Sequence, residues 1–277
     1  MKEKRNKKVK IAFIGGGNMG AALIAALVRR KLFRASEIGL FEPDAARLKG
    51  LRRKIPITPF SSNHELTRAT RTILLAVKPQ QMALILEEIR PAVTSKHLVI
   101  SIAAGLDTNY FSKRLPEGTR LIRAMPNMGA QIGEGMTGLF AAKGSTKGDR
   151  TLAQKIFSAA GKAVFVDHEE LLDAVTAVSG SGPAFVYLFI DALIQAGIAR
   201  GLLPELSRTL VLQTIFGAAR MVEASKDSIT EMIGHVASKG GTTEAGLKIL
   251  EEGRFRELIR QTIDTATERA KDLRCIS

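Results

Sequence analysis

The sequence predicts an α/β protein in two parts, a doubly wound, mainly parallel sheet followed by an all-helical domain. Up to residue 167, short apolar runs alternate with stretches of helical periodicity, the pattern of strand–helix–strand units. From His168 onward, strand signals stop and long helical periodicities follow one another. We therefore expect a sheet domain at residues 1–167, with a basic tail at 1–8, and a helical domain at residues 168–277.

The expected strands are short runs of apolar and β-branched residues, several of which end at glycine, proline or alanine. They are Val9–Ile14, Ile38–Phe41, Thr72–Val77, Leu98–Ile102, Arg120–Ala124, Thr137–Phe140 and Ala163–Val166. Apolar residues at helical spacing predict helices between them, at Ala21–Leu32, Asp44–Lys54 and Gln80–Ile89. Because ligands of such sheets bind beyond the carboxyl ends of the strands, we look for the functional site there.

The second domain is expected to consist of helices, and one of them is unusually apolar. The predicted helices are Glu169–Val178, Pro183–Arg200, Pro204–Glu223, Ser228–Ile233, Thr243–Glu252 and Phe255–Leu273. The stretch Pro183–Ile190 is apolar on nearly every face, and such a helix has to be buried all round. A small helical domain has little material to bury it with, so we expect it to pack against a second copy of the chain in a homodimer.

Composition and charge exclude several classes of function. The chain is 45% hydrophobic and 25% charged, which is globular, and its apolar runs are shorter than the roughly 18 residues that cross a membrane. No signal-peptide pattern follows the basic start, so we expect a cytoplasmic protein without a membrane partner. The single cysteine, Cys275, and four histidines without HxxxH or HExxH spacing predict no disulfide framework and no metal site.

The net charge of +14 raises the possibility of a nucleic-acid partner. Six of the first ten residues are Lys or Arg, which is typical of a solvated tail, and the remaining excess is spread along helices. The absence of tryptophan and the presence of only two tyrosines leave few platforms on which bases could stack. We therefore expect no nucleic-acid partner, although a positive field would attract anionic substrates and coenzymes.

The segment Gly15-Gly16-Gly17-Asn18-Met19-Gly20 matches GxGxxG between a strand-like run and a helix, which is the context of a Rossmann dinucleotide-binding turn. The first glycine permits the tight turn, the second lets the backbone approach the pyrophosphate, and the third lets helix and strand pack closely. The helix N-terminus adds N–H donors and a partial positive charge. We expect Gly15, Gly17, Asn18, Met19 and Gly20 to bind the coenzyme; the alternative is a plain strand-to-helix turn.

Three further strand ends fall at the edge where the coenzyme is expected. Glu42 follows the second strand, where it could accept hydrogen bonds from the adenosine ribose and repel a 2′-phosphate, which favours NADH over NADPH. Arg47 could still accommodate NADPH, and Glu42 could instead cap the helix at Asp44. Lys78 ends a central strand, where it lies either near the coenzyme or in solvent. Ala103-Ala104-Gly105 ends the next strand, and its small side chains either leave room for the nicotinamide or serve packing alone.

Two segments of the helical half are suited to a small anion. Ser179-Gly180-Ser181-Gly182-Pro183-Ala184 opens the apolar helix, with serines as caps and proline in the first turn. The segment from Ser238 to Gly246 exposes backbone N–H groups before an amphipathic helix, and its hydroxyls add donors. The alternatives are an elaborate helix start and an ordinary connection between helices. The candidate ligands of a substrate carboxylate are Ser179, Ser238, Gly240, Gly241, Thr242 and Thr243.

Taken together, these motifs resemble those of the pyrroline-5-carboxylate reductases, which catalyse the last step of proline synthesis. The resemblance covers nearly the whole chain after the tail. It rests on Phe13–Gly20, Ala76–Gln80, Arg123–Asn127, Gly133–Thr137, Ser179–Ala184, Ser238–Thr243 and Leu250–Gly253. It implies a Rossmann domain with a helical dimerisation domain, and homodimers that often assemble into a higher homo-oligomer. It also implies an active site between one subunit's coenzyme domain and helices that include the partner's.

The resemblance also implies roles for individual residues. The coenzyme would be lined by Asn63, Ala76, Val77, Lys78 and Ala104. Ser238 and the amides of Gly241, Thr242 and Thr243 would hold the substrate carboxylate, with the Thr243 hydroxyl near the ring nitrogen. Hydride transfer from the nicotinamide to the imine carbon of 1-pyrroline-5-carboxylate would give L-proline, with positioning as the protein's main contribution. Thr243 and Lys78 are the candidate catalytic residues.

The chain departs from the family pattern at two places. Lys239 stands where the family usually has proline, and Met128-Gly129 stands where it usually has Thr-Pro, so we expect a more mobile substrate loop. Two alternative functions remain. The first is a β-hydroxyacid dehydrogenase-like enzyme. That class relies on a lysine in the helix after a glycine-rich start, and Pro183–Ile190 contains none. The second is a non-catalytic dinucleotide-binding protein.

Overall fold

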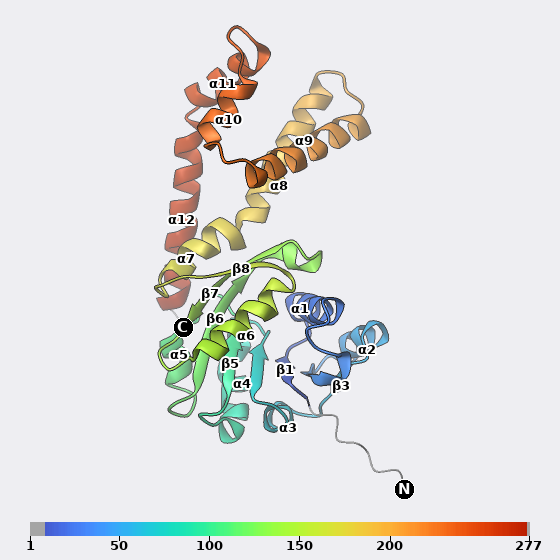
Figure 1. The fold of residues 1–277 in the computed structure, drawn as a ribbon, viewed down its shortest axis with the longest axis vertical. Helices are drawn as coiled ribbons and strands as arrows, with labels where there is room; N and C mark the ends of the chain where they lie inside the picture. Colours follow the sequence, from blue (N-terminus) through green and yellow to red (C-terminus); the bar gives the residue numbers. More distant parts are fainter. Residues whose placement is uncertain (1–8, 276–277) are drawn as a thin grey trace. The chain divides into compact units, whose positions relative to one another are not determined.

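The computed structural model describes residues 9–275, which form two compact units (Figure 1). The first unit comprises the chain through Ser181 together with the end of the chain from Ala266. The second unit is Gly182–Thr265. The last helix, α12 (Phe255–Cys275), begins in the second unit and ends in the first.

The first unit is built on one eight-stranded sheet in the order β3-β2-β1-β4-β5-β6-β7-β8. The strands are β1 (Ile11–Ile14), β2 (Ile38–Phe41), β3 (Thr58–Pro59), β4 (Thr72–Leu75), β5 (Leu98–Ser101), β6 (Arg120–Pro126), β7 (Gly135–Ala141) and β8 (Gly161–Phe165). Neighbouring strands are parallel except β6 and β7. Since β1 pairs with β2 on one side and β4 on the other, the order reverses at β1, which creates a crevice at its carboxyl end.

Helices cover both faces of this sheet (Figure 1). They are α1 (Asn18–Arg29), α2 (Ala45–Lys54), α3 (Asn63–Arg68), α4 (Pro79–Ile89), α5 (Thr108–Ser112), α6 (Lys147–Ser158) and α7 (Leu171–Val175). Phe13 of β1 packs in one core cluster with α1 and α6, while its neighbour Ile14 packs in another with α3, α4 and α5. This alternation follows from successive side chains pointing to opposite faces of a strand, and it confirms the predicted doubly wound sheet.

A short 3₁₀ helix, η1 (Ala35–Glu37), leads into β2 and ends in a carboxylate held by two cations. The Glu37 carboxylate accepts hydrogen bonds from the Arg34 side chain and backbone, each 2.9 Å long, and Lys10 Nζ lies 2.9 Å from Oε1. These contacts, the Arg34 side chain first, lower the pKa of Glu37 to about 2. The carboxylate therefore stays charged well below its ordinary pKa of 4.5.

We expect the ion pairs of Glu37 with Arg34 and Lys10 to make the free energy of unfolding of the first unit depend on pH. A lowered folded-state pKa stabilises the fold fully above the unfolded pKa, and the stabilisation is lost as the pH falls through the folded value. Melting temperatures of the wild type and Glu37→Gln should differ at pH 7 and converge between about pH 4.5 and pH 2. A constant difference across this range would show that Glu37 acts through packing alone.

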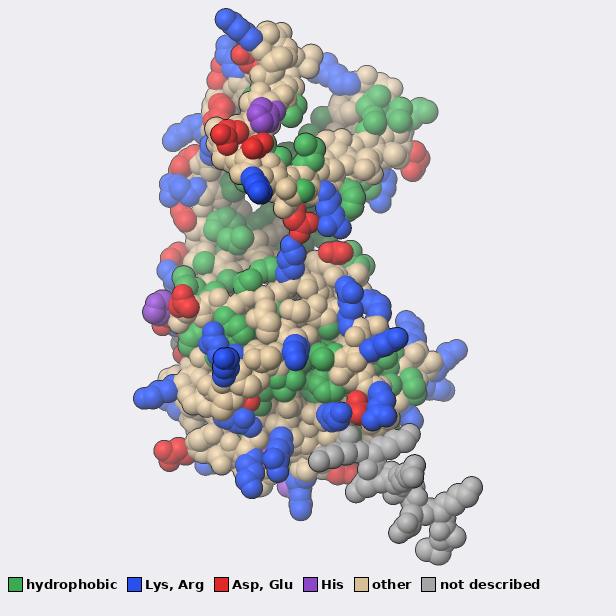
Figure 2. Space-filling view, in the orientation of Figure 1, with side chains coloured by type: hydrophobic (Ala, Val, Ile, Leu, Met, Phe, Trp, Pro, Cys, Tyr) green, Lys and Arg blue, Asp and Glu red, His purple; other side chains and the backbone are tan. Residues whose placement is uncertain are grey.

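The second unit contains α8 (Gly182–Ala199), α9 (Pro204–Ala224), α10 (Ile229–Val236), α11 (Thr242–Glu252) and the first part of α12. Within Gly182–Thr265, all of which the structure describes, Ser207 is the one buried residue. Large apolar side chains are exposed instead, including Tyr187 at 64%, Leu188 at 71% and Phe216 at 58%; hydrophobic side chains over this unit are visible in Figure 2. The unit therefore has almost no core of its own.

One sequence expectation needs correction here. The segment Leu171–Ala199, which contains α7, a π-helical turn and α8, is long and apolar enough to cross a membrane by length and composition, although we expected no such segment. The glycines and serines at residues 179–182 interrupt the apolar pattern, so the sequence did not indicate a segment of this length. The same test is passed by core helices of soluble proteins.

Candidate coenzyme and substrate sites

The glycine turn after β1 is shaped by two contacts that exclude side chains. Gly15 has φ +97°, and a Cβ there would lie 2.5 Å from the Ala76 carbonyl oxygen. A Cβ at Gly20 would lie 2.5 Å from the Gly15 carbonyl oxygen. Around Gly17, in contrast, nothing lies within 4 Å of an added Cβ. The first and third glycines are therefore required for the fold, whereas the second opens the turn to a ligand.

The turn leaves the N-terminus of α1 open to an anion. Gly17 is the N-cap residue and supplies no capping side chain, and the first helical bond runs from the Ala21 N–H to the Gly17 carbonyl. The N–H groups of Asn18, Met19 and Gly20 precede that bond, so they have no partner within the helix. The adjoining cavity of about 470 Å³ has this lining: Ile14, Gly15, Gly17, Asn18, Phe41, Glu42, Pro43, Asp44, Arg47, Ala76, Val77, Lys78 and Gln81. These features fit the phosphates of a dinucleotide.

Glu42 is buried beside this cavity and already accepts several hydrogen bonds. Its Oε2 accepts from the Gly16 N–H at 2.7 Å, and its Oε1 accepts from the Asp44 N–H at 3.0 Å and from Arg47 at 3.2 Å. Asp44 itself caps α2 by accepting from the Arg47 N–H. Glu42 therefore ties the glycine turn to the start of α2, and Arg47 places a positive charge beside it.

The other coenzyme candidates lie at strand ends with different surroundings. Ala76 and Val77 follow β4 and line the cavity, and Lys78 is an exposed N-cap residue of α4 without a capping bond. Ala103 is buried and Ala104 half-buried after β5. Asn63 is buried in α3 and does not line this cavity. Its Nδ2 donates to Glu88 at 2.6 Å, while its Oδ1 has no partner among the described residues.

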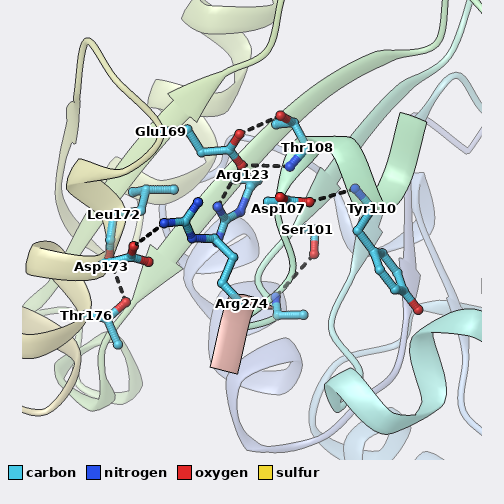
Figure 3. Close-up of polar contacts among 11 residues, drawn as sticks. Ser101, Asp107, Thr108, Tyr110, Arg123, Glu169, Leu172, Asp173, Thr176 and Arg274 are labelled. Carbon is cyan, nitrogen blue, oxygen red and sulfur yellow. Dashed lines mark hydrogen bonds and ion pairs between the residues drawn. The ribbon is translucent and has the colours of Figure 1, made fainter. Parts of the chain in front are cut away.

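A polar network that we did not predict from the sequence fixes the loop after β5 (Figure 3). Glu169 accepts from the Thr108 N–H at 2.7 Å and from Arg123 at 2.7 Å, and its other oxygen accepts from the Thr108 hydroxyl. A separate ion pair lies nearby, in which Arg274, near the end of α12, donates to Asp173 at 3.0 Å. Because these charged groups are largely buried and paired, removing one partner would leave the other uncompensated. The Glu169 contacts with Thr108 thereby anchor the far end of the loop that contains Ala103 and Ala104.

The loop before α11 holds the substrate candidates in the helical unit, and part of its hydrogen-bonding capacity is already used. The Gly240 N–H donates to Glu244 at 2.7 Å, and the Gly241 N–H donates to the Ser238 carbonyl at 3.0 Å. The first helical bond comes from the Ala245 N–H to the Gly241 carbonyl, so the Thr242 and Thr243 N–H groups have no helical acceptor. Among the predicted amides, these two can still receive an anion.

The last substrate candidate, Ser179, and the two departures from the family pattern, at Gly129 and Lys239, lie in different surroundings. Ser179 lies in the first unit, in a π-helical turn, η4 (Thr176–Gly180), that replaces the end of the predicted helix. A Cβ at Gly129 would lie 2.5 Å from the Glu134 carbonyl oxygen, so this turn requires glycine as it is built. Lys239 is exposed. Over the described residues 9–275, no three His, Cys, Asp or Glu side chains form a metal-binding group.

The doubly wound sheet and its open glycine turn define the class of Rossmann-type dinucleotide-binding proteins. Two family models match the chain in separate regions. "NADP oxidoreductase coenzyme F420-dependent" covers residues 10–105, and "Pyrroline-5-carboxylate reductase dimerisation" covers residues 169–273. The first region contains the glycine turn, and the second contains the helical unit.

Relatives and solved structures match over almost the full length. The chain is 38% identical over 264 residues to the pyrroline-5-carboxylate reductase of Methanosarcina acetivorans, covering 95% of this chain and 97% of the relative. Coxiella burnetii pyrroline-5-carboxylate reductase superposes with a TM-score of 0.91 at 35% identity, covering 96% and 98% of the two chains. The Plasmodium falciparum enzyme with NADP bound superposes with a TM-score of 0.86 at 32% identity, covering 97% and 99%. This chain belongs to the pyrroline-5-carboxylate reductase family.

Proposed function

We propose that this protein reduces 1-pyrroline-5-carboxylate to L-proline with a reduced nicotinamide dinucleotide. As a family member it is an NAD(P)H-dependent oxidoreductase of proline biosynthesis. The observation that carries the proposal is the open turn at Gly17 at the carboxyl end of β1, in a chain that matches this family over nearly its full length. Neither alternative function has an observation in its favour.

The protein would bind the coenzyme by its phosphates, and the nicotinamide would then extend toward the end of β5. The Asn18, Met19 and Gly20 amides at the N-terminus of α1 would receive the pyrophosphate, with Lys78 adding a positive charge at the same edge. The small side chains of Ala103 and Ala104 leave space beyond β5. When bound, the reduced nicotinamide supplies the hydride.

The substrate would be gripped by its carboxylate. The Thr242 and Thr243 amides at the N-terminus of α11, together with the Ser238 hydroxyl, form a donor set suited to a small anion. A protonated imine is already electrophilic, so the protein's contribution is orientation, with the Thr243 hydroxyl steadying the ring nitrogen. Lys78 needs no acid or base role in this scheme.

The test is a steady-state assay of purified protein with 1-pyrroline-5-carboxylate and NADH or NADPH, followed at the absorbance of the reduced coenzyme. We expect saturable oxidation of the coenzyme that requires the imine and yields proline. Coenzyme binding without turnover would support the non-catalytic alternative instead. Turnover of a 3-hydroxy acid in preference to the imine would support the dehydrogenase alternative.

We further propose that NADH is preferred, because Glu42 places a buried carboxylate at the adenosine end of the cavity. In Glu42→Gln, the ratio of kcat/KM for NADPH to that for NADH should rise at least about tenfold, which corresponds to about 1.4 kcal/mol. Arg47→Ala should lower the same ratio, because Arg47 is the cation beside that carboxylate. An unchanged ratio in both variants would remove Glu42 from coenzyme selection.

The helical unit belongs to the dimerisation region of the family, which supports assembly into a homo-oligomer. We propose a homodimer as the minimal unit, with the exposed side chains of α8 and α9 covered by a second copy. The cytoplasmic location expected from the sequence remains a prediction.

A further inference from the structure

The π-helical turn η4 leaves one backbone carbonyl without its α-helical donor. In an α-helix, the Ser179 carbonyl would accept from the N–H of residue 183, but that residue is proline. The turn is widened here, because the Ser181 N–H reaches back to the Thr176 carbonyl at 2.8 Å. Short π-helical turns occur frequently at functional sites. The Ser179 carbonyl therefore needs a donor from elsewhere.

That donor is the side chain of Asn127, which follows β6. Its Nδ2 lies 3.1 Å from the Ser179 carbonyl oxygen and 3.3 Å from the Ser179 hydroxyl oxygen. Its Oδ1 accepts from the Met136 N–H at 3.0 Å, and this contact fixes which end of the amide faces Ser179. One side chain thus joins the β6–β7 connection to the π-helical turn.

The Ser179 hydroxyl remains available as a donor. Its oxygen accepts from Asn127, so its proton is not used in that bond. Among the described residues no acceptor is hydrogen-bonded to this hydroxyl, and Ser179 is only half-buried. The hydroxyl is therefore held in place while its proton can still bond to a ligand.

The sheet brings this hydroxyl to the same edge as the coenzyme turn. Registers place Ile14, Leu75, Ser101 and Arg123 side by side across β1, β4, β5 and β6, which are mutually parallel. Asn127 follows Arg123 by four residues, so it projects beyond the carboxyl edge. A dinucleotide with its phosphates at Gly17 reaches toward β5 and β6 with its nicotinamide end.

We propose that Asn127 is a positioning residue of the reduction, which aims the Ser179 hydroxyl at an acceptor oxygen near the reacting carbons. The acceptor is a carbonyl-type oxygen, from either the coenzyme carboxamide or the substrate carboxylate. This inference rests on the proposed function, and it assigns to Ser179 an orientation that its sequence motif does not provide.

The test is a double-mutant cycle with separate measurements of coenzyme and substrate binding. Ser179→Ala should lower kcat/KM about tenfold, the effect of one lost hydrogen bond to a polar ligand. Asn127→Asp keeps the acceptor for Met136 but loses the donor, and it should lower kcat/KM at least as much. The double variant should match Asn127→Asp within about twofold, because the two residues act as one unit. Asn109→Asp, the same change at an exposed position, should stay within twofold of wild type.

The binding measurements identify the acceptor. A raised Kd for NADH by fluorescence titration of Ser179→Ala assigns it to the carboxamide, whereas a raised KM for the imine alone assigns it to the carboxylate. Full activity of Ser179→Ala, or effects that multiply in the double variant, would overturn the inference and leave Asn127 a structural residue. A wild-type protein that fails to reduce the imine would instead overturn the proposed function, so the two failures are distinguishable.

Discussion

Replacing Gly17 with alanine is expected to weaken coenzyme binding at least about 100-fold in a folded protein, whereas replacing Gly15 is expected to disrupt the fold itself. An added methyl at Gly17 meets nothing within 4 Å, and this residue has φ −63°, so the chain tolerates it. The methyl would occupy the space where the pyrophosphate approaches the turn, so the Kd for NADH should rise at least 100-fold. At Gly15, φ +97° and the contact with Ala76 should cost about 3 kcal/mol or more.

Fluorescence titration of NADH and thermal melting of the two variants separate these effects. Gly17→Ala should melt within a few degrees of the wild type, while Gly15→Ala should melt far lower or accumulate as insoluble protein. Gly144→Ala is a suitable control: Gly144 also has positive φ but lies in a loop with nothing within 4 Å, so it reports backbone strain without a clash. Normal NADH affinity of Gly17→Ala would contradict the proposed position of the pyrophosphate.

Replacing Thr243 with alanine is expected to slow turnover while leaving coenzyme binding unchanged. Thr243 lies in the first turn of α11, where its N–H remains available after the substitution and only its hydroxyl is lost. If that hydroxyl steadies the ring nitrogen during hydride transfer, kcat should fall by about 10- to 100-fold. Thr243→Ser should retain most of the activity.

The control for this variant is Thr151→Ala, which removes an exposed helical hydroxyl in α6 that bonds only to its own helix. Stopped-flow measurement of a single turnover distinguishes a slower chemical step from slower product release. Unchanged turnover of Thr243→Ala would show that the Thr243 hydroxyl has no part in hydride transfer, and the loop would then only bind the substrate carboxylate.

Seven of the eight strands of the sheet could be predicted because each is a short, mainly apolar run. β2 matches the predicted Ile38–Phe41, and the other predicted strands lie within a few residues of observed ones. Missing from the prediction were β3, which has two residues, and α3, α5 and α6. The omission of α6 was avoidable, because Thr146 and Asp149 form a capping box before Ile156 and Phe157, which reach the core.

From the sequence, a candidate site could be proposed only where one local segment carries the chemistry. The glycine turn needs no distant partner for its recognition, and the loop before α11 is likewise local in sequence. Glu169 and Thr108 are 61 positions apart, and Asn127 and Ser179 are 52 apart, so no spacing rule could pair them. Gly240 and Gly241 looked available in the sequence, yet their N–H groups are satisfied within the loop, which only the folded backbone reveals.

The near absence of buried residues between Gly182 and Thr265 has a thermodynamic consequence. Apolar area taken out of water is the main favourable term in folding, and a lone copy of this segment removes little of it. In the proposed homodimer, folding of these helices is linked by mass action to association of the two chains. Diluting the protein should therefore lower the stability of these helices. Newly made chains should have to associate quickly to avoid proteolysis.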